Sequence, residues 1–94
     1  EFSLEQNYPN PFNPTTQMIV AVPVTTPIEV VVYDLLGRNV RTLLQGVVPA
    51  GFHTLEWNGQ NNGGNRVNSG VYFIRMTASG TQPFSATRKM VLLQ

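Results

Sequence analysis

The single histidine and the serine hydroxyls are the side chains that nucleophilic catalysis would have to use. The 94 residues contain no cysteine, and His53 is the only histidine. A serine nucleophile needs that histidine as general base and a carboxylate such as Asp34 to orient it. His53, however, is expected on the same face of a strand-like segment as Leu55 and Trp57. A histidine at the edge of the core, bonded to a neighbour, is the simpler interpretation, and we expect no enzyme activity.

Carboxylates and amides offer two further kinds of site. Glu29 and Glu56 are expected on the outward faces of different strands, whereas a glycosidase needs two carboxyl groups roughly 5–9 Å apart across a cleft. The segment 58–65 (NGQNNGGN) resembles a calcium loop only superficially, because its candidate ligands are neutral amides and calcium favours carboxylates. Asn and Gly form turns there without an ion. The sequence therefore predicts no catalytic residue, no metal site and no cofactor.

Aromatic side chains leave one binding chemistry open. Carbohydrate modules stack sugar rings on exposed aromatic residues, and Tyr8, Phe12 and Phe52 are candidates for exposure. Trp57, the only tryptophan, lies on a face expected to be core. The alternative function is thus a structural or carbohydrate-binding accessory module of a secreted polysaccharide-degrading enzyme. A Lys–Asn cross-link through Lys89, the only lysine, is not supported, since nothing in the sequence places the required trio together.

Composition excludes several classes of protein. Charged residues make up 12% of the chain and the net charge is +1, which argues against a nucleic-acid partner. A hydrophobic share of 41% argues against disorder. No apolar run approaches the roughly 20 residues that span a bilayer, and the start has no signal peptide. Because the sequence opens at Glu1 rather than methionine, we expect a piece of a longer protein.

Strand patterns fill most of the chain, interrupted by seven prolines and eight glycines. Residues 2–8 alternate weakly. Clear alternation of apolar and polar residues, rich in β-branched types, predicts strands over 16–22, 28–33, 39–44, 52–57, 70–78 and 84–93. About seven strands joined by turns predict an all-β fold, an immunoglobulin-like antiparallel β-sandwich. We expect one domain over 1–94, with 1–15 as a Pro/Asn-rich N-terminal crossing and 16–94 as the sandwich body.

Alternation also predicts which side chains point inward. Trp57 and Tyr72 are expected at the centre, and the Tyr72 hydroxyl is expected to bond backbone upstream as a tyrosine corner. Val31 is predicted to face outward, and Arg41 to be solvated. Asp34 should start a turn by accepting local N–H bonds. Ile28, Val30 and Val32 are predicted to face inward. In three other strands alternation only groups side chains on a shared face: Met18, Val20 and Val22; Tyr72, Ile74 and Met76; and Arg88, Met90 and Leu92.

The most unusual segment is 7–14, NYPNPFNP, with three prolines in six residues. Proline fixes φ, removes an N–H donor and makes the preceding residue extended. We therefore predict an ordered, polyproline-like crossing with Tyr8 and Phe12 as anchors. Two interpretations of this segment stay open: it staples the first edge of the sandwich, or it presents a recognition surface.

Six segments, taken in order, resemble the C-terminal sorting domain (type A) of the bacterial type IX secretion system. They are NYPNPFNPTT (7–16), VYDLLGR (32–38), AGFH (50–53), WNG (57–59), SGVYF (69–73) and TRKMV (87–91). Together they cover nearly the whole chain. Asn58 stands where that family usually has Asp. The middle and end also resemble the immunoglobulin-like domain of the flagellar hook-capping protein, a related sandwich without the Asn-Pro-Phe-Asn-Pro opening.

This resemblance implies an address rather than an activity. Such domains direct a larger secreted protein, fused N-terminally, through the periplasm and outer membrane of a Gram-negative bacterium to the cell surface or beyond. The implied partners are the outer-membrane translocon and a sortase-like surface protease, with a weak homodimer through exposed strands as a further possibility. The implied translocon-recognition residues are Gly70, Val71, Tyr72, Lys89, Met90 and Val91. The N-terminal motif comprises Asn10, Pro11, Phe12, Asn13 and Pro14.

Lys89 has two interpretations. Its charge would protect an edge strand, or its side chain would contact the translocon; both can hold together. A partner could read the last strand either by strand pairing or through its surface.

Overall fold

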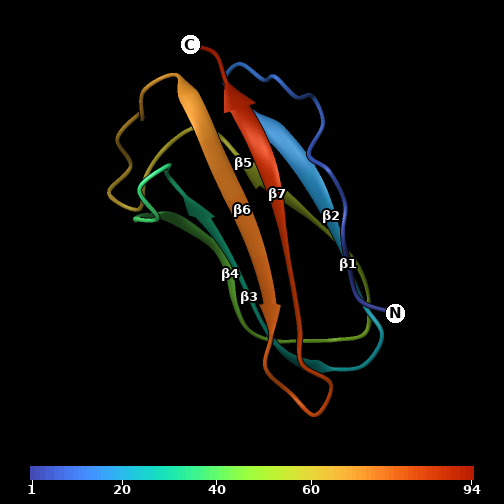
Figure 1. The fold of residues 1–94 in the computed structure, drawn as a ribbon. Helices are drawn as coiled ribbons and strands as arrows, with labels where there is room; N and C mark the ends of the chain where they lie inside the picture. The colour runs from blue at the N-terminus through green and yellow to red at the C-terminus, as the bar shows by residue number, and fades with distance from the viewer.

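A computed structural model describes residues 1–94 as two antiparallel sheets packed face to face (Figure 1). The smaller sheet has the order β1-β2-β5 and is made of β1 (Ser3–Leu4), β2 (Thr16–Val22) and β5 (Gly51–Trp57). The larger sheet has the order β4-β3-β6-β7 and is made of β3 (Thr26–Tyr33), β4 (Asn39–Val48), β6 (Gly70–Ala78) and β7 (Phe84–Leu92). The predicted immunoglobulin-like β-sandwich of seven strands is confirmed. The chain contains no helix long and apolar enough to cross a membrane.

The core lies between the sheets and is centred on Trp57, which is 0% exposed. Its indole packs between two other aromatic rings, with centroids 5.6 Å from Phe12 and 5.2 Å from Tyr72. All the predicted inward positions are buried. Val31 was expected to be outward; it is only 2% exposed. It occupies an outer row between Thr42 and Arg75 on the neighbouring strands, whose side chains flank it on both sides.

Two strands of the larger sheet are longer than predicted. β3 begins at Thr26 rather than at residue 28, and β4 continues to Val48 rather than ending at 44. The added residues pair with each other, Thr26 with Val48 and Pro27 with Val47. Irregularities after Val30 and Val32 shift the register along the pair. The local alternation of residue types did not predict this extension, because the added residues are stabilised by pairing with a segment that is distant in the sequence.

Residues 7–14 form a series of bends instead of the predicted polyproline-like run. All three X–Pro bonds in this segment are cis. Phe12 is an anchor as predicted, at 2% exposed, but Tyr8 is 81% exposed and is not one. The Tyr8 backbone pairs with Gln17 of β2. Because Gln17 is exposed on the outer side of the sheet, the Tyr8 ring points outward with it.

The loop after β5 folds over the free edge of β4. The Asn62 backbone N–H donates to the Val40 carbonyl oxygen (2.9 Å), and the Thr42 N–H donates to Asn62 Oδ1 (3.0 Å). Arg41, expected to be solvated, is half-buried and donates to the Asn61 carbonyl oxygen at 2.9 Å. A side-chain amide and a backbone amide thus stand where another strand would pair with β4.

The Tyr72 hydroxyl donates to the Asn68 carbonyl oxygen at 2.6 Å, so the predicted tyrosine corner is confirmed. Replacing Tyr72 with phenylalanine removes this bond and leaves the ring in the core. We expect the free energy of unfolding to fall by about 0.5–1.5 kcal/mol, measured by urea denaturation followed through Trp57 fluorescence. Tyr33→Phe is the matched control, because the half-buried Tyr33 hydroxyl makes no hydrogen bond within the chain. Equal losses in the two variants would show that the corner bond contributes nothing.

Candidate recognition surface

The two segments implied in recognition are cross-strand neighbours. Val71 pairs with Val91, Tyr72 with Met90 and Gly70 with Leu92, at the end of β7 nearest the C-terminus. They meet because β6 and β7 form a hairpin turned at residues 79–83. Figure 1 shows the two strands side by side at the front of the larger sheet.

Strand alternation divides the six implied residues between two environments. Tyr72 is 7% exposed and Met90 is 0% exposed, and both side chains belong to the core. Lys89 is exposed, whereas Val71 and Val91 are half-exposed on the opposite side of the strands. A partner can therefore touch Val71, Lys89 and Val91 directly, while Tyr72 and Met90 act only by holding the strands in place.

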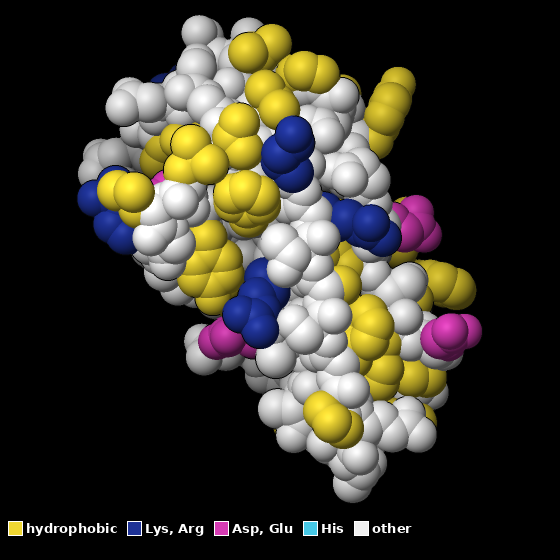
Figure 2. Space-filling model, in the orientation of Figure 1, with side chains coloured by type: hydrophobic (Ala, Val, Ile, Leu, Met, Phe, Trp, Pro, Cys, Tyr) yellow, Lys and Arg dark blue, Asp and Glu magenta, His cyan; other side chains and the backbone are white.

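These outward residues belong to a larger apolar surface, here called the outer β6–β7 face. It comprises Tyr33, Val71, Phe73, Lys89 and Val91, in which Tyr33 pairs with Phe73 and Phe73 with Lys89 across three strands. Figure 2 shows hydrophobic side chains over the upper part and the lower right of this side of the molecule, with Lys and Arg side chains set among them. An apolar surface rimmed by charge is typical of a protein interaction site.

Basic residues are confined to the side of the larger sheet. All six lie on β4, β6 or β7 or in the loops that lead into β4 and β6: Arg38, Arg41, Arg66, Arg75, Arg88 and Lys89. The strands of the smaller sheet carry one charged residue, Glu56. Arg38 is paired with Asp34 at 2.8 Å, and Lys89 makes no ion pair. The outer β6–β7 face therefore presents an unpaired positive charge within an apolar surface.

The N-terminal motif lies against the outer edge of β7. The Phe12 N–H donates to the Val91 carbonyl oxygen (3.0 Å), and the Leu93 N–H donates to the Phe12 carbonyl oxygen (2.9 Å). Asn10 bonds the same edge through its side chain. Pro11 and Asn13 are exposed and Pro14 is half-buried. The contacts are those of a staple, one of the two interpretations drawn from the sequence, and the edge that it covers belongs to the last strand.

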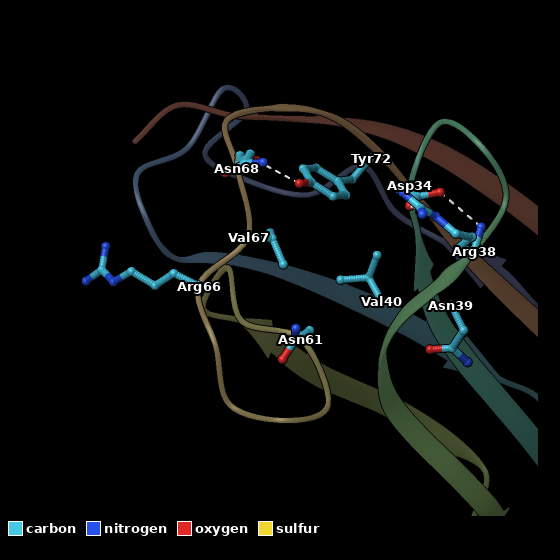
Figure 3. Close-up of a pocket in the computed structure, with 9 residues that line it drawn as sticks. All are labelled: Asp34, Arg38, Asn39, Val40, Asn61, Arg66, Val67, Asn68 and Tyr72. Carbon is cyan, nitrogen blue, oxygen red and sulfur yellow. Dashed lines mark hydrogen bonds and ion pairs between the residues drawn. The ribbon is translucent and has the colours of Figure 1, made fainter.

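A polar groove of about 350 Å³ lies beside the outer β6–β7 face, between the turn at residues 34–39 and the loop at 61–68 (Figure 3). Two pairs of its polar residues bond each other, Asp34 with Arg38 and Tyr72 with Asn68. Asp34 Oδ1 also accepts from the N–H groups of Leu36 (2.9 Å) and Arg38 (3.0 Å), as predicted for a turn. The pKa of Asp34 is lowered, chiefly by the hydrogen bond from the Arg38 N–H; desolvation, the next largest effect, opposes this, and the Arg38 side chain and the Leu36 N–H add smaller lowering effects. Burial raises the pKa of Tyr72, with the Asp34 charge adding to it. The groove contains no serine and no histidine.

The residues considered for catalysis and sugar stacking lie apart. His53 Nε2 is 2.8 Å from the Pro49 carbonyl oxygen, as expected for a histidine bonded to a neighbour. No group of three His, Cys, Asp or Glu side chains comes close enough to hold a metal ion. Trp57 is buried and cannot stack on a sugar, whereas Phe52 is 80% and Tyr8 81% exposed.

Sequence reasoning missed the contribution of side-chain amides to the site. Gln6 and Asn10 both bond the Lys89 carbonyl oxygen, and they lie 83 and 79 positions away along the chain. No local pattern signals such a contact. The available hint was chemical, because an Asn set between prolines has a side-chain donor and acceptor where the neighbouring backbone lacks N–H groups.

Comparisons with known proteins agree with this geometry. The model of the FlgD Ig-like domain family matches residues 11–82. The basal-body rod modification proteins FlgD of Salmonella typhimurium and Salmonella typhi are each 43% identical over 63 residues, which is 65% of this chain and 27% of theirs. The chain thus spans about a quarter of the length of these curated relatives.

Three solved structures share the fold. PorU of Porphyromonas gingivalis aligns with a TM-score of 0.78 at 18% identity, over 99% of this chain and 9% of its own. FlgD of Pseudomonas aeruginosa gives 0.64 at 24% identity, over 82% of this chain and 61% of its own. PorZ of P. gingivalis gives 0.63 at 22% identity, over 99% of this chain and 11% of its own. Since the family model covers most of the sandwich, this chain belongs to the FlgD immunoglobulin-like domain family.

Proposed function

We propose that this chain is a non-enzymatic C-terminal secretion and sorting domain. It directs a larger protein, fused before Glu1, from the periplasm through the outer membrane by type IX secretion and to the cell surface. The translocon contacts the outer β6–β7 face, and a sortase-like surface protease then removes the domain from its passenger. A weak homodimer through exposed strands is compatible with this role.

The outer β6–β7 face is the observation that carries the proposal. It is built by the two segments that resemble the sorting-domain motifs SGVYF and TRKMV, which are neighbours in the fold. The FlgD family match leaves out residues 1–10 and 83–94. Those two segments contain Asn10 and the whole of β7, and they bond each other. The two segments outside the matched range thus meet at the proposed recognition residues of β7.

The solved structures add support of a more general kind. PorZ is described as an essential bacterial surface component of the type IX secretion system. A sandwich of the same fold as this chain therefore occurs in a protein of that system. The low identity limits this support to the fold.

Export of a fused passenger tests the proposal. Residues 1–94 are placed behind a passenger with a Sec signal in a host that has type IX secretion, and the passenger is quantified in periplasm, surface and medium. We expect export with the complete domain and periplasmic retention after deletion of residues 89–94. Normal export of the truncated fusion would contradict the proposal.

Because that deletion removes part of a core strand, a charge reversal on the surface provides a second test. Lys89→Glu changes an exposed side chain on the outer β6–β7 face, and we expect it to reduce export several-fold without changing the fold. Glu56→Lys is the matched control, an exposed charge reversal on the smaller sheet, and should export normally. Equal export by the two variants would remove the outer β6–β7 face from recognition.

The carbohydrate-binding alternative rests on the exposed rings of Tyr8 and Phe52. It predicts retardation in affinity electrophoresis against xylan, mannan or cellulose, reduced by Tyr8→Ala or Phe52→Ala. Unchanged mobility on all three polysaccharides would dismiss it.

A further inference from the structure

The outer edge of β7 is occupied by a short piece of the same chain. Without it, the Lys89 carbonyl, both polar groups of the Val91 backbone and the Leu93 N–H would point away from β6 with no partner in the sheet. Residues 6–12 bond all four. Gln6 Nε2 donates to the Lys89 carbonyl oxygen at 2.8 Å, and Phe12 bonds the Val91 carbonyl oxygen and the Leu93 N–H. The edge from Lys89 to Leu93 is therefore closed.

The Asn10 side chain takes the place of a peptide group in this contact. Asn10 Oδ1 accepts from the Val91 N–H at 2.9 Å, and Asn10 Nδ2 donates to the Lys89 carbonyl oxygen at 3.4 Å. In a parallel sheet, a residue opposite Met90 would make those two bonds with its own backbone. Phe12 makes the next two bonds of the ladder with its backbone, in a parallel bridge to Leu92. Asn10 and Phe12 together thus reproduce two successive positions of a parallel strand.

The N-terminal segment makes fewer contacts with the outer edge of β7 than β6 makes with its other edge. Nine residue pairs join β6 and β7, whereas two backbone bonds and three side-chain amide bonds hold the outer edge. Pro9 and Pro11 have no N–H to contribute. Asn10 is itself exposed. Further down the strand, no bond from the N-terminal segment reaches Ser85 or Thr87.

We infer that the β7 edge from Lys89 to Leu93 is a strand-acceptor site and that Asn10–Phe12 occupy it as an internal mimic of a partner strand. The partner that fits is an extended polypeptide segment running parallel to β7, with a large apolar residue two positions after its first ladder contact. That residue takes the place of Phe12, which is 2% exposed with its ring 5.6 Å from Trp57. Strand addition to a sheet edge is an established mode of peptide recognition.

The inference deepens the proposed function and rests on it for the identity of the partner. The acceptor edge adjoins Lys89 and Val91 of the outer β6–β7 face. One partner can therefore contact the face first and then exchange its own strand for residues 10–12.

Hydrogen exchange of the complete 94-residue chain tests the internal mimic. In Asn10→Ala we expect the Val91 amide to exchange at least about tenfold faster, since it loses its acceptor and opens locally. The Met90 and Leu92 amides, which face β6, should be unchanged. Asn10→Asp keeps an acceptor and should keep Val91 protected. Asn13→Ala is the matched control, because the Asn13 side chain makes no hydrogen bond to β7. Unaltered exchange at Val91 in Asn10→Ala would overturn the mimic.

A synthetic peptide of residues 7–14, added in trans, tests the acceptor site itself. Weakening the internal competitor raises the fraction of chains with an open edge, so the peptide should bind Asn10→Ala about tenfold more tightly than wild type. Binding is followed by shifts of the Val91 and Leu93 amide signals in NMR spectra. Absence of these shifts in Asn10→Ala, or equal affinity for both proteins, would overturn the site. Neither experiment measures export, so a failure of the acceptor site would not contradict the proposed function, which the export assay tests separately.

Discussion

Trp57→Ala is expected to lower the free energy of unfolding by about 3–5 kcal/mol. The indole is fully buried, packs against Phe12 and Tyr72, and donates from Nε1 to the Gln60 carbonyl oxygen at 2.9 Å. Alanine leaves a cavity between the two sheets and an unpaired carbonyl. Since domains of this size are stable by roughly 5–15 kcal/mol, this loss removes a large part of the total stability.

Denaturation by urea, followed by far-ultraviolet circular dichroism because the variant has no tryptophan, measures this loss. Phe52→Ala is the control: it removes an aromatic ring from the same strand at a site that is 80% exposed, and should change stability by less than about 0.5 kcal/mol. A loss below about 1 kcal/mol for Trp57→Ala would place the ring outside the core and restore it as a candidate sugar platform.

Met90→Ala should cost about 2–5 kcal/mol, whereas Lys89→Ala should change stability by no more than about 0.5 kcal/mol. The two residues are adjacent in β7, but Met90 is 0% exposed in the core and Lys89 is exposed on the outer β6–β7 face. Thermal unfolding of both variants gives the comparison. Similar effects at the two positions would mean that the assignment of faces in β7 is wrong.

Export of the same two variants then separates two ways of disturbing recognition. Lys89→Ala should reduce export while the domain stays folded. Met90→Ala should reduce export only as far as it unfolds the domain, and a temperature at which it is folded should restore export. A defect in Met90→Ala that persists at such a temperature would show that the core position affects recognition directly.

The body of the sandwich could be predicted from its sequence because strand alternation is a local signal. Met18, Val20 and Val22 repeat every second position, and each is buried in the structure. The turn at Asp34 could be predicted equally well, since its hydrogen bonds join residues two and four positions apart. Where a side chain and its bonding partner lie in one short segment, residue type and spacing determine the outcome.

The recognition surface could be predicted from the sequence only in part. The resemblance identified the residues of β6 and β7, and alternation placed Tyr72 and Met90 on the faces opposite to Val71, Lys89 and Val91. The closure of the β7 edge could not be predicted, because Asn10 and Val91 are 81 positions apart along the chain. The prediction that Arg41 is solvated was wrong for the same reason, since the carbonyl group that its side chain bonds belongs to a loop 20 residues away. Tertiary proximity, not residue type, decides which amides and guanidinium groups find partners.

Both outer edges of the larger sheet are covered with the help of asparagine, Asn62 on β4 and Asn10 on β7. Many proteins discourage the edge-to-edge assembly of sheets with charged side chains, whose repulsion weakens with added salt and changes with titration. An amide neither titrates nor depends on ionic strength for its effect. In a chain with only 12% charged residues and a net charge of +1, we therefore expect the protection of these two edges to change little with pH or salinity.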